Sequence, residues 1–144
     1  MATSIHHTPA RVDWITLAVR DLHRSSAFYE ALGFGPGKAR GEDLLLFDLE
    51  PGILALIGID RLAAETGVQA GKPGAVLLSR NLASEEAVHA MVERLKDAGG
   101  TPTRETGATP WGTVSGWMLD PDGHPWEICF NPHSQESSQE ESTT

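Results

Sequence analysis

Alternating apolar and polar residues in this chain predict short strands, and apolar residues three or four apart predict helices between them. The stretch WITLAV, residues 14–19, alternates in this way and predicts the first strand. Asp21 then offers a typical helix N-cap. Phe28 and Leu32 lie one helical turn apart, and Gly33 suits the position that follows a helix. The first part of the chain therefore predicts a strand followed by a helix.

Two apolar runs follow, LLLFDLE at 44–50 and GILALIG at 52–58. The turn residues Pro51 and Gly52 lie at their junction, which predicts a β-hairpin. A short helix is expected from about Asp60 onward. The glycine-rich segment at 67–74 then indicates a linker.

The same order of elements recurs after the linker. Residues 75–81 predict a strand, and Ser84 caps a helix whose apolar stripe ends at the Gly99–Gly100 pair. A strand is expected at 101–105, followed by a hairpin formed by 114–120 and 125–130. The stripe consists of Val88, Met91, Val92 and Leu95.

The two halves also match in sequence, which indicates an internal repeat. LAVRDL at 17–22 aligns with LLSRNL at 77–82, an offset of 60 residues. Each half reads strand, helix and three strands, and one such half cannot cover both faces of its small sheet. We therefore predict one α+β domain in which two βαβββ modules share a core and a curved mixed sheet.

Composition excludes several classes of function. The 144 residues suit one domain, and the net charge of −9 with no basic face argues against nucleic acid. No run approaches the ~20 apolar residues that span a bilayer, so no membrane association is expected. The single cysteine, Cys129, excludes an intramolecular disulfide, so we expect a cytoplasmic protein. The polar segment at 133–144 is expected to be a disordered acidic tail.

Two longer motifs carry a family resemblance. ITLAVRDLHRSSAFYEALGF at 15–34 and WGTVSGWMLDPDGHPWEICFNP at 111–132 resemble the opening and the close of the vicinal oxygen chelate superfamily. This superfamily includes glyoxalase I, bleomycin-resistance proteins and extradiol dioxygenases. The resemblance covers 12–132 and implies βαβββ modules at 12–66 and 75–132 whose strands curl around a cleft, with helices outside. It also implies a homodimer with ligand pockets near the subunit boundary.

Metal-dependent members of that superfamily place four ligands on their strands. Carried onto this chain, the four positions hold Trp14, Leu56, Gly74 and Glu127. A divalent ion needs several oxygen, nitrogen or sulfur ligands, and one carboxylate does not supply them. We therefore expect no metal and no cofactor, which argues against glyoxalase I and dioxygenase activity and places the chain in a metal-free branch.

Strand parity then assigns side chains to the cleft. If Glu127 points inward, Cys129 does too, and the cleft becomes an aromatic and aliphatic chamber with one carboxylate. For Trp14 the alternative to ligand binding is core packing, and for Trp111 the alternative is a surface lid over the core. The predicted ligand-binding residues are Trp14, Thr16, Phe47, Leu54, Leu56, Trp111, Glu127 and Cys129.

Glu127 has three interpretations. It pairs with an arginine, a lysine or a backbone donor, or it anchors a cationic or hydroxyl-bearing ligand, or it acts as a general base. The first functional hypothesis is a metal-free protein of the bleomycin-resistance type, which confers antibiotic resistance by sequestering an aromatic or cationic small molecule. The alternative is a metal-independent isomerase, lyase or cyclase that uses Glu127 as its catalytic base.

Overall fold

The computed structural model describes residues 10–133 and contains three helices and eight strands. The first half consists of β1 (Trp14–Val19), α1 (Leu22–Ala31), β2 (Lys38–Ala39), β3 (Leu44–Asp48) and β4 (Ile53–Gly58). Helix α2 (Ile59–Thr66) follows β4. The second half consists of β5 (Leu78–Asn81), α3 (Glu85–Asp97), β6 (Thr101–Ala108), β7 (Val114–Leu119) and β8 (Pro125–Phe130).

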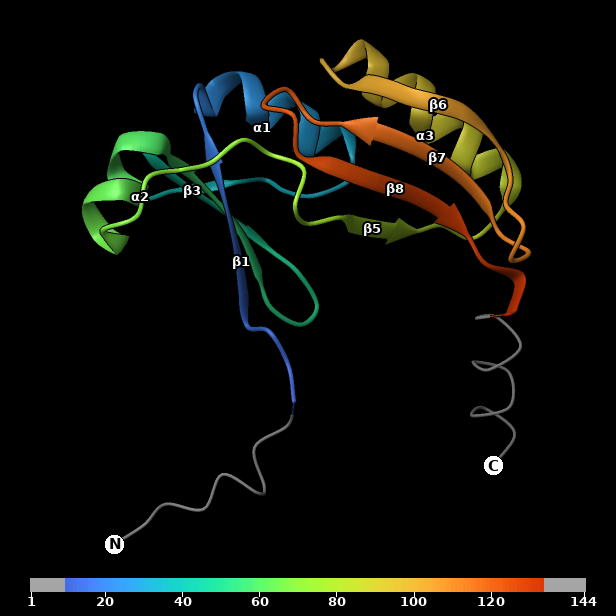
Figure 1. Cartoon of the computed structure of the whole chain (residues 1–144), viewed down its shortest axis with the longest axis horizontal. Coiled ribbons are helices and arrows are strands. Elements are labelled where there is room, and N and C mark those ends of the chain that lie inside the picture. The colour runs from blue at the N-terminus through green and yellow to red at the C-terminus, as the bar shows by residue number, and fades with distance from the viewer. Residues whose placement is uncertain (1–9, 134–144) are drawn as a thin grey trace, which may run out of the picture.

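The strands form two four-stranded mixed sheets (Figure 1). Sheet A has the order β1-β4-β3-β2, and sheet B has the order β5-β8-β7-β6. In each sheet the first strand of the half runs parallel to the last one, and the other pairs are antiparallel. The α+β fold with two βαβββ modules is confirmed, and its sheets stay separate instead of closing into one.

The predicted helix caps are also confirmed. The Asp21 side chain accepts a hydrogen bond from the Arg24 backbone N–H at 3.0 Å, and Ser84 accepts one from Ala87 at 3.1 Å. These caps begin α1 and α3 at the places where the sequence predicts them. Gly33 follows the C-cap of α1 with a φ of +102°, a conformation that favours glycine.

One hydrophobic core joins the two modules. Helix α1 packs on sheet A, α3 packs on sheet B, and the two helices contact each other. Three residues predicted for the cleft lie in this core: Phe47, Leu54 and Leu56, each at most 1% exposed. That assignment was wrong because β4 pairs with β1 so that Leu54 and Leu56 stand opposite Ile15 and Leu17, on the helix side of the sheet.

The pairing also corrects the repeat offset. The caps Asp21 and Ser84 are 63 residues apart, and Ile15 occupies the place in sheet A that Leu78 occupies in sheet B. Thr16 stands beside Ala55, as Ser79 stands beside Glu127. The structural counterpart of Trp14 is therefore Leu77 and not Gly74, and the counterpart of Glu127 is Ala55 and not Leu56.

The turn between β7 and β8 fastens the second module to the first. The Asp122 side chain is 4% exposed and accepts hydrogen bonds from the Arg20 backbone, the Arg24 guanidinium and the Ser25 hydroxyl at 2.8–3.2 Å. Asp120 accepts a hydrogen bond from the Tyr29 hydroxyl of α1, and Trp126 donates to the same hydroxyl. The turn therefore holds the relative position of the two modules.

Gly116 lets α3 approach sheet B closely. A Cβ at this position would overlap Val92 Cγ2 and lie 3.2 Å from Thr106 Oγ1. We expect Gly116→Ala to lower the free energy of unfolding by about 1.5 kcal/mol, because overpacking forces neighbours aside. Gly107→Ala is the matched control, since a Cβ there meets nothing within 4 Å. Urea denaturation measures both variants. Equal losses of stability in Gly116→Ala and Gly107→Ala would contradict this packing. So would a double variant in which Val92→Ala, by removing the overlapping Cγ2, does not reduce the loss caused by Gly116→Ala.

Some sequence predictions concern segments at the ends. Of the predicted acidic tail at 133–144, only His133 lies within the described residues. Within residues 10–133, no helix combines the length and apolar character needed to cross a bilayer.

Candidate functional site

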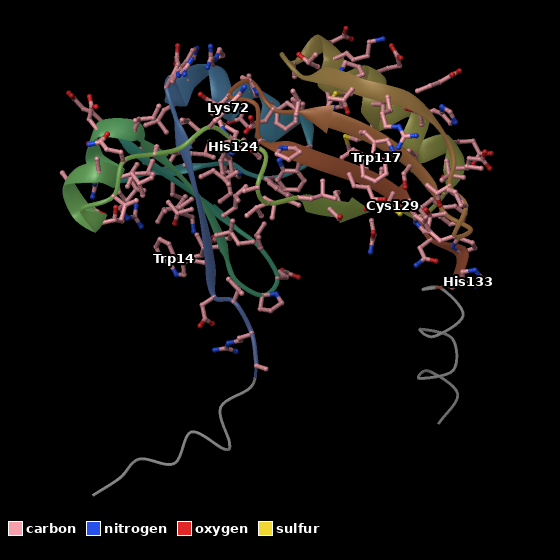
Figure 2. The ribbon with its side chains drawn as sticks, viewed as in Figure 1. Trp14, Lys72, Trp117, His124, Cys129 and His133 are labelled. Carbon is pink, nitrogen blue, oxygen red and sulfur yellow. The ribbon has the colours of Figure 1, made fainter. Side chains whose placement is uncertain are left out.

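The face of sheet B that points away from α3 carries the candidate site. On β8, Trp126 and Ile128 point into the core, so Glu127 and Cys129 point the other way. Trp117 and Ser115 pair with Glu127 and Cys129 and share their face. Figure 2 shows Trp117 and Cys129 in front of the ribbon of sheet B. We call this side of the sheet, with Ser79, Ser115, Trp117, Glu127 and Cys129, the open face of sheet B; Ser115 and Cys129 are buried in it.

Two serine hydroxyls hold the carboxylate of Glu127. Ser79 Oγ donates to Oε1 at 3.1 Å, and Ser115 Oγ donates to Oε2 at 2.8 Å. No ion pair joins Glu127 to a cation among residues 10–133. Neutral donors therefore fix the orientation of the carboxylate, and no cation of the described residues forms an ion pair with it. Sequence reasoning missed both serines as site residues, although Ser79 and Ser115 lie within the predicted strands at 75–81 and 114–120.

A chain of hydroxyl groups continues from Ser115 toward the loop between β6 and β7. The Thr113 hydroxyl lies 3.3 Å from Ser115 Oγ and 2.7 Å from the Thr109 hydroxyl. Thr113 and Ser115 are buried, whereas Thr109 is half-buried. The chain thus connects Glu127, through buried hydroxyls, with a loop at the surface.

One tryptophan lies beside this carboxylate, and a second tryptophan shares a hollow with the first. Trp117 is the register partner of Glu127 and is half-buried, and Trp111, in the loop between β6 and β7, is 62% exposed. Both line a hollow of about 180 Å³ that also includes Arg104 and Glu105. The pairing of Trp117 with Glu127 places Trp117 on the open face.

Other predicted site residues lie on sheet A. Trp14 is 49% exposed, and Thr16 points to the same side of β1, away from the core residue Leu17. Figure 2 shows Trp14 well apart from Trp117 and Cys129. Within one chain, the predicted ligand residues therefore divide between two surfaces: Trp14 and Thr16 on sheet A, and Trp111, Glu127 and Cys129 on sheet B.

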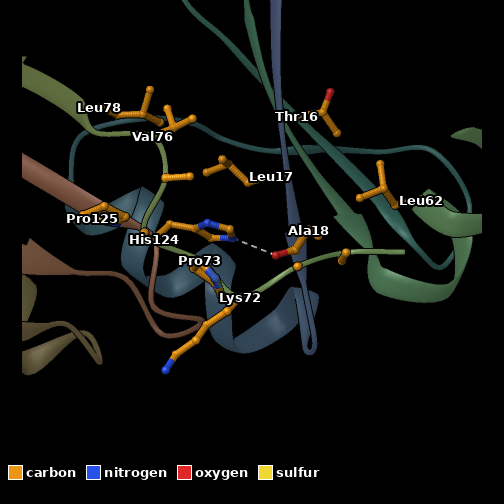
Figure 3. A pocket seen from close by; sticks show the side chains of 14 residues that line it. Thr16, Leu17, Ala18, Leu62, Lys72, Pro73, Val76, Leu78, His124 and Pro125 are labelled. Carbon is orange, nitrogen blue, oxygen red and sulfur yellow. Dashed lines mark hydrogen bonds between the residues drawn. The ribbon is translucent and has the colours of Figure 1, made fainter. Parts of the chain in front are cut away.

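A pocket of about 340 Å³ lies between the modules. Thr16 and Ala18 line it from β1, the linker at 70–76 lines it from another side, and Pro125 lines it from the start of β8. In this pocket His124 Nε2 lies 2.8 Å from the Ala18 carbonyl oxygen (Figure 3). Glu127 lies two residues beyond Pro125 on the same strand, β8.

The four family metal positions, corrected by the strand pairing, hold Trp14, Ala55, Leu77 and Glu127. Only the glutamate offers an atom that binds a divalent ion, and the other three side chains are apolar or aromatic. Residues 10–133 contain no cluster of three or more histidine, cysteine, aspartate or glutamate side chains that would hold an ion. These residues do not fit the metal centre of the metal-dependent members.

The sequence matches the Glyoxalase/Bleomycin resistance protein/Dioxygenase superfamily over residues 11–128. The chain belongs to this superfamily. Its fold is also that of a glyoxalase-related enzyme from Fulvimarina pelagi, with 36% sequence identity and a TM-score of 0.81. That match covers 86% of this chain and 90% of the other.

More distant structures share the fold alone. A hypothetical protein from S. aureus has a TM-score of 0.76 at 23% identity, over 86% of this chain and 95% of the other. Lactoylglutathione lyase from Agrobacterium tumefaciens has a TM-score of 0.65 at 20% identity, over 85% of this chain and 95% of the other. No curated protein matches the sequence significantly.

Proposed function

We propose that the protein binds a small aromatic or cationic molecule on the open face of sheet B without a metal ion. The observation that carries this proposal is the carboxylate of Glu127, which two serines orient and which forms no ion pair within residues 10–133. Trp117 beside it offers an aromatic surface for stacking and for cation–π contact. Sequestration of such a compound, as in bleomycin resistance, is the physiological role that this site supports best.

Titration of tryptophan fluorescence with para-methylbenzylamine tests this function. The wild-type protein is expected to bind this aromatic cation more tightly than the uncharged para-methylbenzyl alcohol. Glu127→Gln should lower the affinity for the amine by about tenfold, because a charge-assisted hydrogen bond becomes a neutral one. The affinity for the alcohol should change little.

Glu30→Gln is the matched control, since it removes an exposed carboxylate from α1 on the opposite side of the fold. Equal affinities of Glu127→Gln and the wild type for the amine would refute a binding role for Glu127. Mass spectrometry of the recovered probe shows whether the protein binds it unchanged, as sequestration requires.

The hydroxyl chain favours a second function, a metal-independent isomerase, lyase or cyclase. Glu127 would take a proton next to a carbonyl group, and Ser115, Thr113 and Thr109 offer a route for that proton toward the surface. Turnover of a carbonyl substrate that is lost in Glu127→Gln while binding persists would support this function over sequestration.

We also infer that the protein forms a homodimer in the cytoplasm. Each chain carries Trp14 on sheet A and Glu127 on the open face of sheet B. The exposed side chains of Val12, Val76 and Leu77 add apolar surface. Two copies that place sheet A of one against sheet B of the other would enclose a complete chamber. Sedimentation equilibrium tests the dimer, and a monomer at all concentrations would contradict it.

A further inference from the structure

Opposite charges lie on the strands to either side of Trp117 in sheet B. Register pairing places Arg104 of β6 opposite Trp117 of β7, and Trp117 opposite Glu127 of β8. Trp117 and Glu127 therefore point to the same side of the sheet. The register of β6 shifts on both sides of Arg104, and Arg104 is assigned to that side because it lines the same hollow as Trp117. A cation, an indole and a carboxylate therefore form one row across three adjacent strands.

Arg104 has no carboxylate partner within residues 10–133. It lines the hollow of about 180 Å³ together with Trp111 and Trp117. Glu105 lines the same hollow, yet it makes no ion pair with Arg104. The guanidinium also borders a second hollow on the α3 side, next to His89 and Lys96. An exposed arginine that lines one hollow with two tryptophans suits a planar ligand that carries a carboxylate.

We propose that the ligand of this site is bipolar: an aromatic compound with an acidic group for Arg104 at one end and a basic group for Glu127 at the other. Adjacent strands lie ~4.8 Å apart, so the Cα atoms of Arg104 and Glu127 are separated by roughly 10 Å. Trp117 lies between them, where an aromatic ring of the ligand stacks. This inference rests on the proposed function and narrows its ligand class.

The three parts of the row fix three features of the ligand. Its charges lie at opposite ends of the molecule, because the two protein charges flank Trp117 and do not meet. Its body is flat, because an aromatic ring stacks best on the indole surfaces of Trp111 and Trp117, which both line the hollow. Its acidic group binds at the edge strand β6, where the side chain of Arg104 is exposed to solvent.

Three probes separate these contributions: para-(aminomethyl)benzoate carries both charges, para-methylbenzoate only the acid and para-methylbenzylamine only the amine. Isothermal titration calorimetry measures each against the wild type, Arg104→Gln and Glu127→Gln. The bipolar probe is expected to bind the wild type most tightly. Arg104→Gln should weaken the two carboxylate-bearing probes about tenfold or more and leave the amine unchanged.

Arg94→Gln is the control for net charge, because it removes an exposed arginine from α3 without touching the row. Circular dichroism checks that every variant folds. Equal losses for all three probes in Arg104→Gln, or the same loss in Arg94→Gln, would overturn the bipolar ligand.

The failure of this inference differs from the failure of the proposed function. If binding of the amine requires Glu127 but Arg104→Gln leaves the affinity for the carboxylate-bearing probes unchanged, the proposed function holds and the bipolar ligand is wrong. If no probe depends on Glu127, the proposed function itself is wrong, and so is the inference that rests on it.

Discussion

Replacing Asp122 by alanine is expected to lower the free energy of unfolding by about 3 kcal/mol, because a buried carboxylate that accepts several hydrogen bonds is lost. Its donors belong to the first module: the backbone of Arg20, the guanidinium of Arg24 and the hydroxyl of Ser25. Ser25 is fully buried, so its hydroxyl loses its acceptor where water does not replace it.

Urea denaturation of Asp122→Ala measures this loss. Asp97→Ala serves as the control, because Asp97 is an exposed aspartate at the end of α3. The double variant with Ser25→Ala should lose less than the sum of the single changes, since both remove the same hydrogen bond. If Asp122→Ala is as stable as Asp97→Ala, the turn does not fasten the modules together.

The second large effect is a loss of stability in alkaline solution through Tyr29. Burial raises the pKa of Tyr29 far above its ordinary value of 10.0, and the nearby Asp120 carboxylate raises it further. The folded state therefore keeps the phenol proton at a pH where the unfolded chain releases it. This contribution to stability is complete below pH 10 and is lost as the pH rises above it, by about 1.4 kcal/mol per unit.

Tyr29 is the only tyrosine of the chain, so the absorbance of phenolate reports on it alone. The folded protein should show no phenolate until it unfolds, and both signals should then change together. Tyr29→Phe should remove this part of the pH dependence, although it also leaves Asp120 without one donor. A phenolate signal that rises near pH 10 in a protein with native circular dichroism would contradict the burial of Tyr29.

Local signals in the sequence were sufficient for most of the elements. Asp21 and Ser84 begin helices because a short polar side chain satisfies a free backbone N–H, and this requirement depends on no distant residue. The strand β8 also has the predicted parity, since Trp126 and Ile128 are core residues and alternate with Glu127. Short-range physics thus determined the elements and the side of the sheet to which Glu127 points.

Pairing between distant strands was harder to predict. The run 53–57 is apolar at every position, so alternation does not reveal which side chains of β4 face the core. Glu127 follows the turn glycine Gly123 by four residues, and the same count from Gly52 gives Leu56. The strand pairing shows that the counterpart of Glu127 is Ala55, which follows Gly52 by only three residues. Likewise, the repeat offset of 60 came from aligning identical residues in 17–22 and 77–82, whereas the helix caps Asp21 and Ser84 are 63 residues apart.

The candidate site was only partly visible in the sequence for the same reason. Glu127 and Trp111 were identified, but Ser79 and Ser115 hold the carboxylate from neighbouring strands that lie 48 and 12 residues away in the chain. Serine occurs at buried and exposed strand positions alike, so the alternation of apolar and polar residues did not identify Ser79 and Ser115 as site residues. The pairing of Arg104 with Trp117 depends on register shifts of β6 on both sides of Arg104, and local sequence patterns do not predict such shifts.

Metal dependence of ligand binding tests the central claim most directly. The protein is dialysed against a chelator, its metal content is measured, and para-methylbenzylamine is then titrated with and without added zinc, nickel, iron or manganese. We predict that no stoichiometric metal remains after dialysis. The affinity of the wild type for para-methylbenzylamine should be the same with and without each added metal, and it should be lower only in Glu127→Gln. A metal ion that is retained stoichiometrically and is required for binding would contradict the claim that Glu127 acts without one.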